Sequence, residues 1–210
     1  MYNLPYFKEY DQSVVLEFMK KHPFATLIGC DNNRSYATQI PLLFETRNDK
    51  LILIGHMMRK QDHQKAFENN PNVLVLFTGP HTYVSASWYH HPHQASTWNY
   101  MTVHARGEIR FLDEKGLEDA LQRLSAYYEN NNPHSPTVFS NLPEDYRTKL
   151  MKSIVAFEIE VQQIENVFKL SQNRDETSYE HIIEKLAQGD EDAKKISGEM
   201  KARSSQLFNS

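Results

Sequence analysis

Residues 96–113 read "STWNYMTVHARGEIRFLD", and this stretch has the alternating pattern of a long β-strand. Side chains of a strand point alternately to its two faces, so residues two apart share a face. From Met101 onward, one face has the composition of an ordinary barrel core, with Met101, Val103 and Ala105. The other face mixes aromatic and polar side chains: Trp98, Tyr100, Thr102, His104 and Arg106.

The mixed face of this strand needs hydrogen-bonding partners if it is buried, because an unpaired polar group costs free energy away from water. Such a face suits a subunit interface or an aromatic ligand. The alternative is a solvated face, since scattered surface aromatics are common in soluble proteins.

Other runs rich in apolar and β-branched residues surround this strand. About six or seven strands with short turns and no regular βαβ alternation predict a mainly β, α+β protein. We expect an antiparallel barrel with peripheral helices, and an open α+β sheet is the alternative. The further strand runs are "FATLIGC" (24–30), "YATQIPLLFE" (36–45), "KLILIGHM" (50–57), "NVLVLFTG" (72–79) and "SIVAFEIEVQQIENVFKL" (153–170).

Capping residues and helical spacing predict the helices. Asp11 and Asp113 stand where they can cap helices over 12–22 and 114–130. Thr177 and Glu180 form a capping-box pattern. The remaining helices are predicted over 59–70, from near Pro143, over 181–187 and over 190–203.

The composition is that of a soluble globular protein, with 40% hydrophobic and 24% charged residues. Cys30 is the single cysteine, so an internal disulfide cannot form. The N-terminal residues lack a signal-peptide pattern, and no run approaches the roughly 20 apolar residues of a membrane span. We therefore expect a cytoplasmic protein without membrane contact. The net charge of −4 disfavours a broad nucleic-acid surface.

Three histidines, His90, His91 and His93, lie in the loop before the long strand. Adjacent residues of an extended segment point in opposite directions, so His90 and His91 rarely bind one metal ion. The stretch supplies no cysteine or carboxylate as a further ligand. We expect a solvated histidine-rich loop and no metal site.

Two polar stretches are candidate sites. In "GHMMRKQDHQ" (55–64) a strand gives way to a helix, and Arg59 and Lys60 stand where an anion could bind, with His56 as a further donor. In "KLSQNR" (169–174) several donors suited to carbonyl or phosphate groups follow the last strand. The alternative for the first stretch is a pair of solvated cations, and the alternative for the second is a polar loop without a ligand.

Four motifs together resemble the PaiB family of FMN-binding negative transcriptional regulators. They are "PFATL" (23–27), "GPHTYVSASWY" (79–89), "TWNYMTVHARG" (97–107) and "KLSQNR" (169–174). The resemblance extends from the N-terminal "MYNLPYF" to "KLSQNR". That family is similar to the pyridoxamine 5′-phosphate oxidase-like split barrels.

The resemblance implies a Greek-key antiparallel split barrel, a homodimer, and FMN in a cleft between subunits. Residues 1–175 would form the FMN-binding barrel domain, and residues 176–210 a C-terminal helical appendage. Arg59 and Lys60 would hold the FMN phosphate, and "ATQIP" (37–41) would run beside the flavin ring. The cofactor-binding residues implied in this way are Thr38, Gln39, Ile40, His56, Arg59, Lys60, Trp98, Asn99, Lys169, Gln172, Asn173 and Arg174.

Three functions remain open. The family resemblance favours a flavin-binding negative transcriptional regulator, although no helix-turn-helix with a basic recognition helix is present. A flavin-dependent oxidoreductase that uses NAD(P)H is the alternative, because the flavin itself carries such chemistry. Haem binding is a weaker alternative, and the sequence contains no pattern of catalytic side chains that decides whether the protein is an enzyme.

Overall fold

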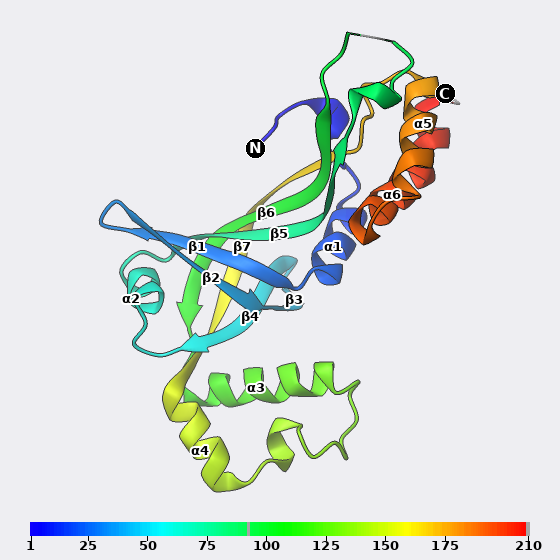
Figure 1. Cartoon of the computed structure of the whole chain (residues 1–210). Helices are drawn as coiled ribbons and strands as arrows, with labels where there is room; N and C mark the ends of the chain where they lie inside the picture. The colour runs from blue at the N-terminus through cyan, green and yellow to red at the C-terminus, as the bar shows by residue number, and fades with distance from the viewer. Residues whose placement is uncertain (92, 209–210) are drawn as a thin grey trace. The chain divides into compact units, whose positions relative to one another are not determined.

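The computed structural model describes residues 1–91 and 93–208, and its strands form one sheet in the order β2-β1-β5-β6-β7-β4-β3 (Figure 1). The pairs β1–β2, β1–β5, β3–β4 and β4–β7 are antiparallel. This arrangement confirms the predicted α+β class. The strands are β1 (Phe24–Asp31), β2 (Arg34–Pro41), β3 (Leu43–Arg47), β4 (Lys50–Met58), β5 (Asn72–Val84), β6 (Thr97–Phe111) and β7 (Ile154–Lys169).

The α-helices of the described residues are α1 (Gln12–Lys21), α2 (Asp62–Asn69), α3 (Glu114–Tyr128), α4 (Glu144–Ser153), α5 (Glu176–Leu186) and α6 (Glu191–Phe208). Short 3-10 helices lie at Pro5–Phe7, Ala86–Trp88 and Phe139–Asn141. None of the described helices is long and apolar enough to cross a membrane.

The chain forms two compact units. Unit 1 consists of Met1–His22, Thr78–Val103 and Glu165–Ser210, and unit 2 of Pro23–Phe77 and His104–Ile164. Strands β5, β6 and β7 each contribute residues to both units. The predicted division after residue 175 stays a prediction.

Two tight hairpins lie in unit 2. Asn32 and Asn33 join β1 to β2 with φ of 47° and 61°, and Asn48 and Asp49 join β3 to β4 with φ of 49° and 61°. Two consecutive residues with positive φ match the twist of antiparallel strands, and Asn and Asp tolerate this conformation best after Gly. These hairpins set the registers Phe24↔Pro41 and Leu43↔Ile54.

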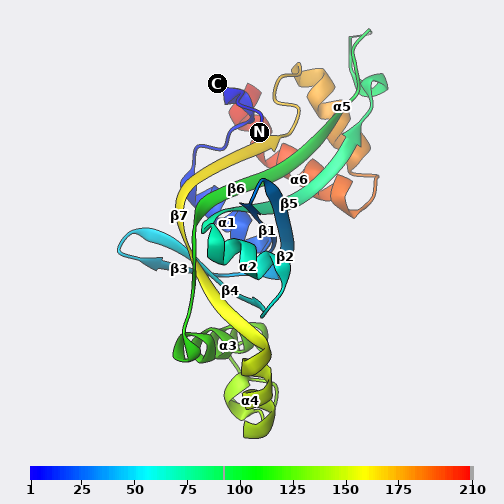
Figure 2. The ribbon, with the colours of Figure 1, turned by 90° about the vertical axis from the view of Figure 1, so that its left-hand side faces the viewer.

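The sheet of unit 2 curls, because β2 also contacts β4, which is not its neighbour in strand order. Gly55 of β4 provides the space for this approach. A Cβ atom at position 55 would lie 3.1 Å from Ile40 Cγ2 and 2.7 Å from the Phe157 ring. A contact between non-adjacent strands is a feature of a barrel and not of an open sheet. Figure 2 shows α2 beside β1 and β2.

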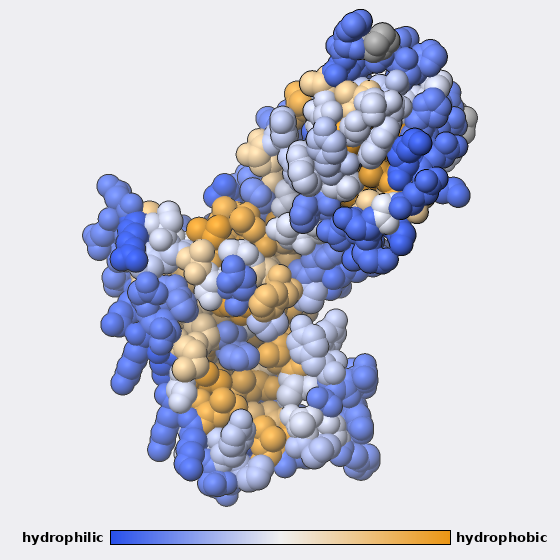
Figure 3. All heavy atoms as spheres, in the orientation of Figure 1, coloured by the Kyte–Doolittle hydropathy of each residue, from blue (hydrophilic) through white to orange (hydrophobic). Residues whose placement is uncertain are grey.

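A second apolar layer of unit 2 joins α3 and Phe139 to the outer face of β3, β4 and β7. In Figure 3, apolar side chains gather at the level of α3. Burying this cluster stabilises the unit by about 25 cal/mol per Å² of apolar area removed from water. Its buried members are Leu43, Ile52, Ile54, Leu117, Ala120, Leu121, Phe139, Ile154 and Ala156.

Unit 1 is built on α1, α5, α6 and the ends of three strands. Asp11 caps α1 by accepting from the Ser13 amide at 2.8 Å. Helices α5 and α6 lie side by side (Figure 1). Tyr179 is fully buried in unit 1, and its hydroxyl donates to the Met200 carbonyl at 2.9 Å.

The structure corrects three sequence-based predictions. The run 36–45 divides into β2 and β3, because Pro41 has no N–H and the Leu42 amide donates to the Pro23 carbonyl at 3.0 Å. Helix α2 begins at Asp62, so Arg59 precedes the helix. Asp175 caps α5 by accepting from the Ser178 amide at 2.9 Å, in place of the predicted capping box.

Candidate flavin site

Strands β2 and β4 of unit 2 line one cavity of about 520 Å³. Thr38, Gln39 and Ile40 come from β2, whereas His56 comes from β4. The contact between β2 and β4 brings these two segments together. Met57, Met58, Gln61 and His63 of the candidate stretch 55–64 line the same cavity, and so does Ile154, which sequence reasoning did not assign to a site.

His56 is the titratable group of β4 in this cavity. Its side chain is half-buried, and burial lowers the pKa of the imidazole below its usual range. His56 is therefore neutral at pH 7, with one ring nitrogen as donor and the other as acceptor. A neutral imidazole suits hydrogen bonding to a heterocycle better than neutralising a phosphate.

The cationic side chains next to this cavity belong to the turn after β4. The Arg59 amide donates to the Ser153 carbonyl at 2.9 Å. Lys60 has a φ of 65°, and its amide donates to Gln64 Oε1 at 2.5 Å. The hydrogen bonds of these two backbone amides therefore fix the turn. They do not involve the side chains of Arg59 and Lys60, which can contact ligand or solvent.

Arg59 is half-buried and lines a different cavity from Thr38, together with Glu114 and Lys152. Lys60 is exposed. The structure thus places the predicted ring-side residues around one cavity and the predicted phosphate ligands on the adjoining turn. Each of these residues belongs to unit 2.

The remaining predicted residues belong to unit 1, where Lys169 contacts the start of β6. The Lys169 ammonium donates to the Thr97 hydroxyl and, at 2.9 Å, to the Trp98 carbonyl. Burial, and then the positive charge of Arg174, lower the pKa of Lys169. Trp98 is 54% exposed, with its ring 6.0 Å from that of Tyr83.

Asn99 is fully buried in unit 1. Its Oδ1 accepts from the Ser171 hydroxyl at 3.0 Å, and its Nδ2 lies 3.5 Å from Met200 Sδ. Ser171 has a φ of 63°, which marks a sharp turn after β7. The hydrogen bond between Ser171 and Asn99 therefore links this turn to β6.

Gln172 and Arg174 also have protein partners, whereas Asn173 is exposed. Gln172 Oε1 accepts from the Leu170 amide at 2.7 Å. The Arg174 guanidinium lies 4.1 Å from the centre of the Tyr89 ring and donates to Gln94. Because the predicted residues fall in different units, their role in one common flavin site stays a prediction.

Among residues 1–91 and 93–208, no group of three His, Cys, Asp or Glu side chains is placed to hold a metal ion. The His90 amide donates to the Ser178 hydroxyl at 2.9 Å, and the His90 and His91 rings are 4.9 Å apart. A hydrogen bond to α5 therefore anchors the backbone at His90.

The β2–β4 cavity has the size of a small-molecule pocket. A ligand pocket of this kind has a volume of about 300–1,000 Å³, mostly apolar walls and a few polar groups. Ile40, Pro41 and Met57 supply apolar surface, while Thr38 and Gln39 supply polar groups. The antiparallel sheet and this cavity describe a split-barrel protein with a ligand-sized cavity in unit 2.

Residues 1–163 match the family model described as "Putative FMN-binding domain", and the chain belongs to that family. It is 34% identical over 186 residues to "Protease synthase and sporulation protein PAI 2" of Bacillus subtilis, covering 89% of each chain. It is also 27% identical over 211 residues to an uncharacterized protein of Emericella nidulans, covering 81% of this chain and 84% of that protein. The predicted family is confirmed.

Solved structures share the fold. The flavocytochrome Anf3 from Azotobacter vinelandii aligns with a TM-score of 0.56 and 15% identity, over 80% of this chain and 72% of that chain. The FAD and heme binding protein from Mycobacterium smegmatis aligns with a TM-score of 0.51 and 13% identity, over 77% of this chain and 72% of that chain. Because the sequence identities are this low, the structural similarity confirms the split-barrel fold and carries no conclusion about function.

Proposed function

We propose that this chain binds FMN at the β2–β4 cavity of unit 2. The observation that carries the proposal is the convergence of Thr38–Pro41 and His56–Met58 on one cavity of about 520 Å³. The flavin ring would lie against Thr38, Gln39 and Ile40. Its phosphate would extend toward the turn of Arg59 and Lys60.

The residues of the cavity would bind and orient the ring. Bound flavin supplies hydride or electron transfer, and the protein supplies position and electrostatics. The Gln39 amide can donate and accept, so it can pair with a carbonyl or a ring nitrogen. Neutral His56 can donate one hydrogen bond without adding charge beside the ring.

Gln39→Ala is expected to weaken FMN and riboflavin binding to the same degree. One lost neutral hydrogen bond corresponds to about 0.5–1.5 kcal/mol, or roughly two- to tenfold in Kd. Flavin-fluorescence titration of the parent and the variant measures the change. Gln163→Ala is the matched control, because Gln163 is exposed in unit 2 and lines another cavity. An equal effect in both variants would argue against a ring site beside Gln39.

We also propose a regulatory role as a negative transcriptional regulator in the cytoplasm. Support comes from the resemblance to the PaiB family and from the Bacillus subtilis relative, whose name is "Protease synthase and sporulation protein PAI 2". Binding to a labelled promoter fragment must weaken steeply with salt if Lys and Arg contact phosphates. Salt-independent binding, or none, would contradict direct action on DNA.

A flavin-dependent oxidoreductase is the competing proposal, and steady-state NADPH oxidation with added FMN separates it from a purely regulatory protein. Haem binding would be detected as a Soret band after haem addition. Sustained turnover that depends on FMN would favour the enzyme, whereas FMN binding without turnover would favour the regulator.

Self-association is proposed through the start of β6. The exposed side chains of Trp98 (54%) and Tyr83 (49%) form an aromatic surface on unit 1 that a second copy could cover. Light scattering coupled to size exclusion should give the mass of a dimer at micromolar concentration. A monomer mass would contradict the proposed homodimer.

A further inference from the structure

A pocket of about 270 Å³ in unit 2 is lined by residues of α3, of α4, of the loop between them and of β4. We call it the α3 pocket. His56 of β4 lines both this pocket and the β2–β4 cavity. Residues two apart share a face of a strand, so His56 lies on the same face as Ile52 and Ile54, which belong to the apolar layer beneath α3.

The walls of the α3 pocket offer apolar surface. Leu124, Leu142 and Leu150 line it and are half-buried, while Tyr128, at the end of α3, is 52% exposed. A ligand can therefore remove part of their apolar area from water. The volume lies just below the usual range of about 300–1,000 Å³, which favours a compound of one or two rings.

Several polar groups of this lining already have partners within the protein. The Ser125 hydroxyl accepts from the Phe139 amide at 2.9 Å. The Glu129 carboxylate accepts from the Ser135 hydroxyl at 2.7 Å, and hydrogen bonds from Ser135 and Thr137 lower the pKa of Glu129. The charge of Glu129 is therefore stabilised internally, and the pocket favours a neutral ligand.

His56 is different, because within residues 1–91 and 93–208 its ring forms no hydrogen bond or ion pair. The side chain is nevertheless half-buried, and burial lowers its pKa, so the ring is neutral at pH 7. A polar group withdrawn from water without a partner costs free energy, which a ligand atom can recover. A neutral imidazole has one donor and one acceptor nitrogen, so it can bond to one ligand in each of the two cavities.

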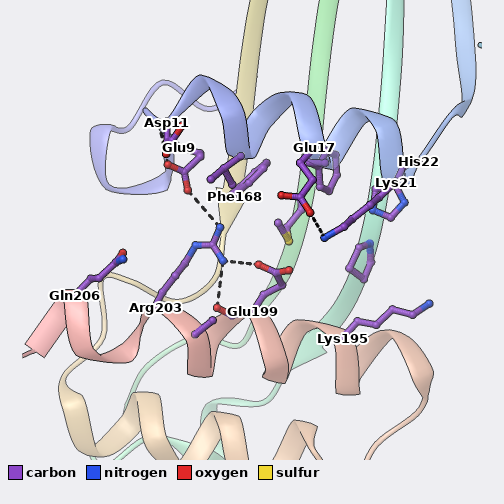
Figure 4. A pocket seen from close by; sticks show the side chains of 15 residues that line it. Glu9, Asp11, Glu17, Lys21, His22, Phe168, Lys195, Glu199, Arg203 and Gln206 are labelled. Carbon is purple, nitrogen blue, oxygen red and sulfur yellow. Dashed lines mark hydrogen bonds and ion pairs between the residues drawn. The ribbon is translucent and has the colours of Figure 1, made fainter. Parts of the chain in front are cut away.

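The cavity between α1 and α6 of unit 1 lacks this feature among its labelled side chains (Figure 4). Arg203 pairs there with Glu9 at 3.3 Å and with Glu199, and Lys21 pairs with Glu17 at 2.7 Å. These ion pairs are internal to the protein, so they indicate no missing ligand. The half-buried imidazole of the α3 pocket does.

We propose that the α3 pocket binds a small neutral aromatic compound that carries a hydroxyl or carbonyl oxygen. The ring would lie against Leu124, Leu142 and Leu150, and the oxygen would hydrogen-bond to His56. Because His56 also lines the β2–β4 cavity, this compound would be a second ligand next to FMN. That placement rests on the proposed FMN site, whereas the pocket and its class of ligand do not.

2-Naphthol, which is neutral at pH 7, and naphthalene, which lacks the hydroxyl, are matched probes. His56→Leu is expected to weaken 2-naphthol binding roughly two- to tenfold, the effect of one lost neutral hydrogen bond. Naphthalene binding should change less than about twofold, since its apolar contacts persist. His134→Leu is the control, because His134 is an exposed residue of unit 2 that lines neither cavity. Equilibrium dialysis without FMN measures each Kd.

Leu150→Trp tests the pocket itself by filling it, while Lys149→Trp places the same ring on an exposed position of α4 outside the lining. We expect Leu150→Trp to abolish binding of both probes and Lys149→Trp to preserve it, with circular dichroism verifying the fold. Unchanged probe binding in Leu150→Trp would overturn the α3 pocket. Equal loss of both probes in His56→Leu, or no loss of either, would overturn the hydrogen bond to His56.

Titration of 2-naphthol at saturating FMN separates this pocket from the proposed flavin site. We expect both ligands to bind together, and FMN binding to survive in Leu150→Trp, because Leu150 does not line the β2–β4 cavity. An apparent Kd of 2-naphthol that rises in proportion to FMN would place the probe in the flavin cavity and overturn the pocket. Binding of 2-naphthol without binding of FMN would contradict the proposed function alone, and FMN binding without 2-naphthol would contradict the α3 pocket alone.

Discussion

Replacing Gly107 with alanine is expected to lower the melting temperature by roughly 6–12 °C. A Cβ atom on residue 107 would lie 2.1 Å from the Glu160 carbonyl oxygen, which belongs to the backbone of β7. A backbone atom cannot rotate away, so β6 and β7 must separate. Overpacking typically costs about 1–3 kcal/mol, and we expect about 3 kcal/mol here because the clash is with backbone; 1 kcal/mol corresponds to about 2–4 °C in a chain of this size.

Gly198→Ala is the matched control for that prediction. Gly198 lies within α6, and a Cβ atom there would meet nothing within 4 Å. Alanine has the better helix propensity by about 1 kcal/mol, so this substitution should stabilise the protein slightly. Differential scanning calorimetry compares both variants with the parent. An unchanged melting temperature for Gly107→Ala would contradict the close approach of β6 and β7.

Tyr179→Ala is expected to destabilise unit 1 by about 3–5 kcal/mol, the range for removing a buried aromatic side chain. The ring is fully buried and lies 5.3 Å from the Phe208 ring. Burial raises the pKa of the Tyr179 hydroxyl to about 12. Urea denaturation, followed by far-UV circular dichroism, measures the loss.

Tyr179→Phe separates the contribution of the ring from that of the hydroxyl. It keeps the aromatic packing and removes only the hydrogen bond to the Met200 carbonyl. The expected loss is about 0.5–1.5 kcal/mol. If phenylalanine destabilises the protein as much as alanine does, the hydrogen bond and not the packing is decisive.

Local sequence pattern predicts most strands and helices of this fold. Alternation over residues 97–105 predicts the observed burial, with Asn99, Met101, Val103 and Ala105 buried along one face of β6. Asp11 and Asp113 cap the helices for which they were proposed. Residues that are close in the sequence determine these features, so the local sequence pattern is sufficient to predict them.

Features that depend on distant pairing could not be read from the sequence. The break between β2 and β3 depends on the hydrogen bond from the Leu42 amide to Pro23. The cavity residue Ile154 was missed, because its place in the site depends on the pairing of β7 with β4. Thr38, Gln39 and Ile40 were assigned through family resemblance and not through any local pattern.

The comparison of FMN with riboflavin in the parent and in Arg59→Ala tests the proposed flavin site most directly. Riboflavin has the same ring without the phosphate, so only FMN should depend on a cation in the turn after β4. A lost charge-assisted bond to phosphate costs about 1.5–3 kcal/mol, or roughly ten- to hundredfold in Kd. Lys50→Ala, at the opposite end of β4, is the control. Flavin-fluorescence titration should show a large loss for FMN and little change for riboflavin. Equal loss of both ligands, or no loss of either, would contradict a phosphate site at Arg59.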